Sequence, residues 1–158
     1  MRLWHIIVLT WLSVFAASCG NTGVGDTFNV SPELSAIDNL MWLQPDSALA
    51  VMLEFSASSE ADSLSEFEGH YCQVLIAELL FKNDYAQSNR TELLKAVDYF
   101  DSIDNAFLAA RAHYNKGVGY YERDSLIEAC GEYLCALRIM ERNFARKNWW
   151  TRRRGLWH

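Results

Sequence analysis

The sequence predicts an all-α protein built from antiparallel helix pairs. The chain of 158 residues is 51% hydrophobic and 22% charged, which is the balance of a chain that folds. It contains only two prolines and eight glycines, too few for the frequent turns of an all-β sandwich. From residue 31 onward, apolar residues recur at spacings of three and four, which is the period of amphipathic helices.

The chain begins with a predicted secretory signal peptide of the lipoprotein type, residues 1–18. Arg2 supplies a positive start, and residues 3–15 form an apolar run that is too short to cross a bilayer of roughly 30 Å. The run ends in Ala16-Ala17-Ser18-Cys19, which resembles a bacterial lipobox with Ala16 where Leu is usual. This resemblance implies that Cys19 becomes the first mature residue and carries a lipid. The alternative is ordinary signal-peptidase cleavage, which leaves Cys19 as a plain thiol.

A tether and two short helices are predicted next. Residues 19–30 include three glycines between positions 20 and 25, and glycine-rich chains act as flexible linkers. Ser31-Pro32-Glu33 places an N-cap, a proline and an acid in the order of a helix start, which predicts a helix to about Trp42. Pro45 begins a second helix that runs to about Phe55. The serine- and acid-rich residues 56–63 are predicted to form a loop.

Two longer helices are predicted after that loop. Ser63 and Glu66 have the spacing of a capping box and precede an apolar helix over residues 67–81. Residues 82–90 are polar and are predicted to be a loop. Thr91 then opens a helix with apolar residues in the same three-and-four spacing, which ends at a turn at residues 104 and 105.

The last two predicted helices complete the pattern. Apolar residues line one helix over residues 107–121. Asp124 and Ser125, with Glu128, have the capping-box spacing and begin the final helix. Its apolar side chains step by four, three, four and three: Leu126, Cys130, Tyr133, Leu137 and Met140. The expected fold is therefore six amphipathic helices without a strand.

The final helix pair, about residues 110–143, resembles one tetratricopeptide repeat (TPR). Five residues lie at offsets 0, +3, +12, +16 and +19, where this family places its small, aromatic and alanine residues: Gly117, Tyr120, Ala129, Tyr133 and Ala136. Small residues there let the two helices approach closely, and the larger ones fill the seam. The chain departs from the family at His113, where Trp is frequent, and at Lys116, where Leu is usual.

Weaker copies of the pattern precede this pair. Ala96, Phe100 and Ile103 repeat the second-helix pattern 33 residues earlier, near the family period of about 34. Residues 45–49 resemble a third, degenerate second helix. The resemblance therefore implies a TPR-like α-solenoid of about two to three repeats over residues 31–143.

Together, the lipobox and the acidic repeats resemble the TPR lipoproteins of Bacteroidetes-type bacteria, and the resemblance implies a short or truncated protein of this kind. The resemblance implies a partner-binding groove on the first helix of the last repeat, at Arg111, Tyr114, Asn115, Val118 and Tyr121. Arginine and tyrosine are frequent in interaction hot spots. The alternative is that Tyr114 and Val118 simply pack on the preceding helix.

No motif for catalysis, metal binding or cofactor binding appears in the sequence. Nucleophile elbow, P-loop and HExxH patterns are missing, and no CxxC pair predicts a zinc site. His70 and His113 have no His or Cys partner three or four residues later, so they are interpreted as surface or seam residues. Cys72, Cys130 and Cys135 are interpreted as buried small apolar residues. The sequence thus favours a protein without enzymatic activity, cofactor or metal.

Charge separates the last residues from the rest of the chain. Nineteen of the 20 acids lie between residues 20 and 137, whereas half of the 14 bases lie between residues 138 and 158. The tail, residues 144–158, is rich in tryptophan and arginine. It has three interpretations: a membrane-surface segment, an RNA-binding segment, or non-native sequence after a frameshift in a longer repeat protein. A globally basic nucleic-acid binder is excluded, and an exported chain would rarely meet RNA.

The leading hypothesis is a non-enzymatic interaction scaffold tethered to the cell envelope, on the periplasmic side or the cell surface. Its partner is an unknown protein or peptide, and its contact with the membrane is the lipid on Cys19. One alternative is the extracytoplasmic sensor fragment of a truncated TPR regulator. The other is a membrane-active function of the basic tail.

Overall fold

The computed structural model describes residues 30–88, 90–103 and 105–154, with side chains up to residue 146. These residues form six α-helices, a short 3-10 helix over Ala61–Ser63, and no strand, which confirms the predicted all-α class. The α-helices are α2 (Pro32–Leu40), α3 (Pro45–Ser56), α4 (Glu66–Lys82), α5 (Arg90–Ser102), α6 (Ala106–Tyr121) and α7 (Leu126–Arg154). The predicted signal peptide, Cys19 and most of the tether lie outside the described residues.

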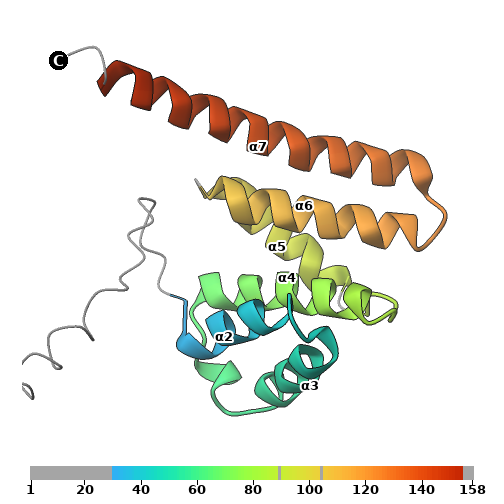
Figure 1. Cartoon of the computed structure of the whole chain (residues 1–158). Coiled ribbons are helices and arrows are strands. Elements are labelled where there is room, and N and C mark those ends of the chain that lie inside the picture. Colours follow the sequence, from blue (N-terminus) through green and yellow to red (C-terminus); the bar gives the residue numbers. More distant parts are fainter. Residues whose placement is uncertain (1–29, 89, 104, 155–158) are drawn as a thin grey trace, which may run out of the picture.

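The helices are stacked in the order of the chain. Each helix packs on the next one along the sequence, and α4 also packs directly on α6. The stack starts with α2 and α3 at one end and finishes with α7 at the other, where α7 lies antiparallel to α6 (Figure 1). Residues far apart in the sequence therefore meet along one side of the stack.

Serine and proline residues set the helix starts, as the sequence indicates. The Ser31 hydroxyl accepts the Leu34 N–H at 3.4 Å, and α3 begins at Pro45 as predicted. The start of α4 differs from the prediction, because the capping box is Ser65 with Glu68 rather than Ser63 with Glu66. The Ser63 hydroxyl instead donates to the Glu60 carbonyl at 2.8 Å, inside the 3-10 helix.

Glu68 also joins the starts of α2 and α4. Its carboxylate accepts the Ser65 hydroxyl at 2.7 Å and the Ser31 backbone N–H at 2.9 Å. The hydrogen bond from Ser65 is the main reason why the pKa of Glu68 lies below its usual value. One carboxylate thus satisfies groups at two helix ends that have no partner within their own helices.

A continuous apolar core runs through α2 to α6. Phe100 lies at its centre with none of its surface exposed. Its ring meets Phe67 and Tyr99 edge-on, with centroids 5.9 and 5.4 Å away, and His70 stacks on Tyr99 at 4.4 Å. His70 is thus a seam residue, one of the two positions expected for it.

The α6–α7 seam depends on Gly117. A Cβ atom at this position would lie 2.6 Å from the Tyr133 ring and 3.3 Å from the Ala129 carbonyl oxygen. Ala129 and Ala136 are buried along the same seam. These contacts agree with the close approach that the small-residue pattern predicts. Tyr120 differs from the prediction that it fills this seam. Its ring lies 5.8 Å from the Arg90 guanidinium and 5.2 Å from the Arg123 guanidinium.

We expect Gly117→Ala to destabilise the protein, although alanine favours helix over glycine by about 1 kcal/mol. The added methyl must displace the Tyr133 ring, and overpacking of this kind costs about 1–3 kcal/mol. The control is Gly131→Ala on α7, where a Cβ has no atom within 4 Å and should stabilise by about 0.5–1 kcal/mol. Urea unfolding measures both; equal stabilisation by the two variants would contradict the close packing at Gly117.

The cysteines and the tail differ in part from expectation. Cys72 is buried, and burial raises the pKa of its thiol to about 11. Cys130 is exposed and Cys135 is half-buried, so the prediction of three buried cysteines is wrong, because position 130 faces away from α6.

Helix α7 continues through residue 143 to Arg154, so the first part of the predicted tail belongs to the same helix as the end of the predicted repeat. None of the described helices is both long and apolar enough to cross a membrane.

Candidate functional site

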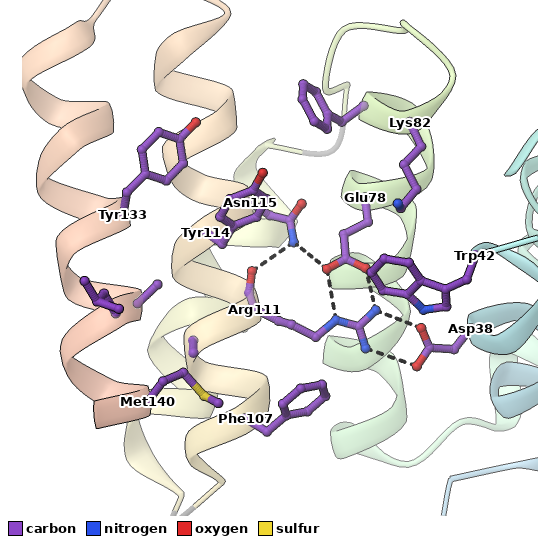
Figure 2. A pocket seen from close by; sticks show the side chains of 14 residues that line it. Asp38, Trp42, Glu78, Lys82, Phe107, Arg111, Tyr114, Asn115, Tyr133 and Met140 are labelled. Atoms are coloured by element: carbon purple, nitrogen blue, oxygen red, sulfur yellow. Dashed lines mark hydrogen bonds and ion pairs between the residues drawn. The ribbon is translucent and has the colours of Figure 1, made fainter. Parts of the chain in front are cut away.

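One side of the stack is hollowed by a cavity of about 720 Å³. Four helices contribute its lining, and Figure 2 shows the side chains that surround it. Most of them are apolar. The lining residues are Asp38 within α2 and Trp42 just after it; Glu78, Phe81 and Lys82 of α4; Phe107, Ala110, Arg111, Tyr114 and Asn115 of α6; and Tyr133, Ala136, Leu137 and Met140 of α7.

Large aromatic side chains around the cavity remain exposed. Trp42 is 67% exposed, Phe107 56% and Tyr114 47%. The Tyr114 and Tyr133 rings lie 5.4 Å apart, and the Lys82 ammonium lies 4.2 Å from the Trp42 ring. Contiguous exposed apolar surface of this kind marks interaction sites in soluble proteins.

A hydrogen-bonded ion cluster lies beside this apolar surface. The Arg111 guanidinium donates to both Asp38 oxygens, at 2.8 and 3.1 Å, and to Glu78 through Nε at 2.9 Å and through a second nitrogen. The Tyr71 hydroxyl donates to Asp38 at 2.5 Å. Figure 2 shows α2, α4 and α6 joined through Arg111.

Hydrogen bonds within the cluster raise the pKa values of Arg111 and Tyr71. Burial alone would lower the pKa of Arg111, but the hydrogen bonds to Glu78 and Asp38 outweigh burial and raise it. Burial and the hydrogen bond to Asp38 both raise the pKa of Tyr71. Arg111 and Tyr71 therefore keep their protons across the physiological pH range, and Arg111 joins three helices through the two carboxylates.

Asn115 carries an unused hydrogen-bond acceptor. Its side chain is fully buried, and its Nδ2 donates to Glu78 at 3.1 Å and to the Arg111 carbonyl at 2.9 Å. Both of these partners are acceptors, which fixes the orientation of the amide. The Oδ1 atom has no partner in the described structure. A buried acceptor without a partner is costly, so a donor from a bound molecule would be stabilised there.

The structure distributes the five predicted groove residues unevenly. Arg111, Tyr114 and Asn115 line the cavity, whereas Val118 is buried in the core and Tyr121 is exposed away from the lining. Most of the Arg111 donors are already used by carboxylates, so this residue braces the site.

Sequence reasoning missed the lining residues from the other helices. Among these are Asp38, Trp42 and Glu78, and Phe107 on α6 itself was missed as well. The sequence does hold a signal for Asp38 and Glu78, namely their distance along the chain from their partners. Asp38 precedes Tyr71 by 33 residues, and Glu78 precedes Arg111 by 33 residues. That separation is close to the repeat period of about 34.

A second polar cluster joins α5, α6 and α7. Asp101 of α5 and Glu132 of α7 contribute its carboxylates. The buried His113 lies 2.6 Å from Glu132 through Nδ1 and 3.2 Å from Asp101 through Nε2. Cys135 lies 3.6 Å from Nε2, and Lys116 lies 2.7 Å from Glu132. Burial opposes the ionisation of Glu132, but the hydrogen bonds from Lys116 and His113 outweigh it and lower the pKa.

In this second cluster, His113 lies in the seam between α5, α6 and α7. Its two ring nitrogens lie within hydrogen-bond distance of carboxylates from two neighbouring helices. Burial and nearby carboxylates raise the pKa of the Cys135 thiol, which opposes formation of a reactive thiolate. No group of His, Cys, Asp and Glu in the described ranges is arranged to hold a metal ion.

Comparison with known proteins adds no family. No family model matches the chain, and no curated protein or solved structure matches it.

Proposed function

We propose that the chain is a non-enzymatic, lipid-anchored interaction protein that binds a peptide segment of a partner in the cavity between α2, α4, α6 and α7. The cavity carries the proposal, because it combines exposed aromatic side chains with a fixed polar brace. Its volume of about 720 Å³ lies within the usual range of about 300–1,000 Å³ for binding sites.

Contacts that recur near the repeat period support a TPR-like solenoid. Asp38 with Tyr71 and Glu78 with Arg111 are each 33 residues apart, and both contacts join alternate helices. The direct packing of α4 on α6 agrees with this arrangement. In a solenoid, alternate helices line one continuous concave surface suited to extended partners.

The chemistry of the cavity describes the segment it would take. Apolar side chains of the partner would pack against Trp42, Phe107 and Tyr114. The charged ends of Arg111, Asp38 and Glu78 already satisfy one another, so the segment needs no charge of its own.

A photo-crosslinking experiment tests the groove. A benzophenone amino acid replaces Tyr114 in the full chain, expressed at the envelope, with the same probe at Leu53 of α3 as the control. Leu53 is 54% exposed and does not line the cavity. We expect a discrete adduct only from position 114, and equal labelling from both positions would contradict the proposal.

Trp42→Ala should weaken binding of the crosslinked segment, made as a synthetic peptide, by at least about tenfold, the effect of an aromatic hot spot. Because Trp42 is 67% exposed, the variant should fold normally. Fluorescence anisotropy of the labelled peptide gives both affinities, with Leu53→Ala as the matched control. Unchanged affinity in Trp42→Ala would remove this residue from the site.

Cys19→Ala should abolish incorporation of labelled palmitate and move the protein from the membrane to the soluble fraction. The reason is that a lipid attached to Cys19 would be the only covalent anchor that the lipobox implies. Persistent labelling in the variant would refute the lipoprotein assignment, while Cys130→Ala serves as the control that keeps its label.

A further inference from the structure

Helix α7 carries an apolar stripe that α6 does not cover. Ala129 and Ala136 are buried on the seam, but a second set of side chains on α7 is exposed. Ile127 is 86% exposed, Leu134 50% and Phe144 65%. The stripe consists of Ile127, Cys130, Leu134, Leu137 and Phe144, with Glu141 at the one polar position. Leu137 also lines the edge of the cavity, so the stripe borders the groove without filling it.

The stripe has the spacing of a helix-pairing surface. Its six positions are separated by three, four, three, four and three residues, an average of 3.4, which is close to the coiled-coil period of about 3.5. The order of these spacings is the same in both directions. A second α7 running the opposite way would therefore place Ile127 opposite Phe144 and Leu134 opposite Leu137, twice over, as a twofold interface requires.

Charge favours the same antiparallel arrangement. The start of α7 and the preceding turn, residues 122–132, contain four acids and one base, whereas residues 138–147 contain four bases and one acid. Antiparallel helices bring these opposite charges together, and parallel helices would bring like charges together. The helix dipoles add to this preference, since each positive end then lies beside a negative end.

We propose that two copies of the chain associate through antiparallel pairing of their α7 helices along this stripe. Leu137 belongs to both the stripe and the cavity lining, so the pairing would cover one side chain at the groove, but the proposal does not depend on the proposed function. Its self-complementary spacing and its polarised charge both favour a second copy over an unrelated partner.

Disulfide trapping tests the pairing and its direction. The full chain carries Cys72→Ala, Cys130→Ser and Cys135→Ser, and then Ile127→Cys or Phe144→Cys, each with its own epitope tag. In the proposed arrangement, positions 127 and 144 are opposite each other, while two copies of position 127 are about 25 Å apart along the helix axis. We expect a dimer that carries both tags after oxidation of the co-expressed pair, and no dimer from either variant alone.

Other outcomes of the trapping would overturn the proposal. Dimers from each variant alone would show a parallel pair. Crosslinks only to proteins of other mass would place a different partner on the stripe. Monomers in every sample, with circular dichroism showing a folded helical chain, would show that the stripe does not pair.

Leu134→Glu supplies an independent measurement on the protein with its native cysteines. Sedimentation equilibrium should show at least tenfold weaker dimerisation for this variant than for the parent chain. Leu53→Glu on α3, with a similar exposure of 54%, should not change it. Equal dimerisation by Leu134→Glu and the parent would refute the pairing, whereas an unchanged crosslink at Tyr114 would keep the groove proposal separate from this result.

Discussion

Arg111→Met should lower the free energy of unfolding by about 3–5 kcal/mol, because it leaves the Asp38 and Glu78 carboxylates partly buried without their cation. The side chain of Arg111 is 11% exposed and joins three helices through two carboxylates. Methionine keeps much of the apolar stem, so the loss comes mainly from the charge. Urea unfolding followed by circular dichroism measures it.

Two controls separate this effect from a general change of charge. Lys95→Met breaks the exposed pair between Lys95 and Glu92 and should cost less than about 1 kcal/mol. Adding Glu78→Gln to Arg111→Met removes one unpaired charge and should recover at least about 1 kcal/mol, since residues in one network are coupled. No recovery in the double variant would show that Arg111 acts through packing alone.

Phe100→Ala should also cost about 3–5 kcal/mol, the usual effect of removing a fully buried aromatic ring. The lost ring contacts Phe67 and Tyr99 in the centre of the core, and these neighbours lie on helices that cannot collapse fully into the space. Because whole-domain stability is typically only about 5–15 kcal/mol, the variant should be close to unfolding at 37 °C.

The matched control is another phenylalanine in a different environment. Phe107 is 56% exposed beside the cavity, so Phe107→Ala should cost about 1 kcal/mol or less. The two variants therefore distinguish an aromatic residue of the core from one of the groove. Thermal unfolding compares them, and similar losses from both would contradict this division.

Local signals in the sequence predicted the helices well and their exact caps less well. Pro45 and Ser31 set helix starts because their effects act within one turn. The shift of the capping box from Ser63 to Ser65 arose because two serines compete at that junction, and the 3-10 helix takes the first. The small-residue pattern around Gly117 agrees with the observed seam, because close helix packing restricts side-chain size directly.

The groove was predicted only from one helix. Tyr114 and Asn115 follow from their places on α6, and Phe107 has the spacing of the same helix face, but nothing in the sequence indicated that Trp42 would share the cavity. Cys130 has the same spacing as Leu126 and Leu137 on the predicted apolar face of the last helix, and all three are exposed. An amphipathic pattern defines an apolar face, whereas the neighbour that covers part of this face depends on how the helices cross.

By itself, the sequence determined an all-α chain of six helices, because hydrophobic periodicity and capping act over a few residues. Only the tertiary structure decided that Arg111 meets Asp38, 73 residues away, and that Asn115 Oδ1 has no partner. Such pairings depend on helix crossing and side-chain direction across the whole stack. Those quantities are set by the packing of the complete core, so no local pattern contains them.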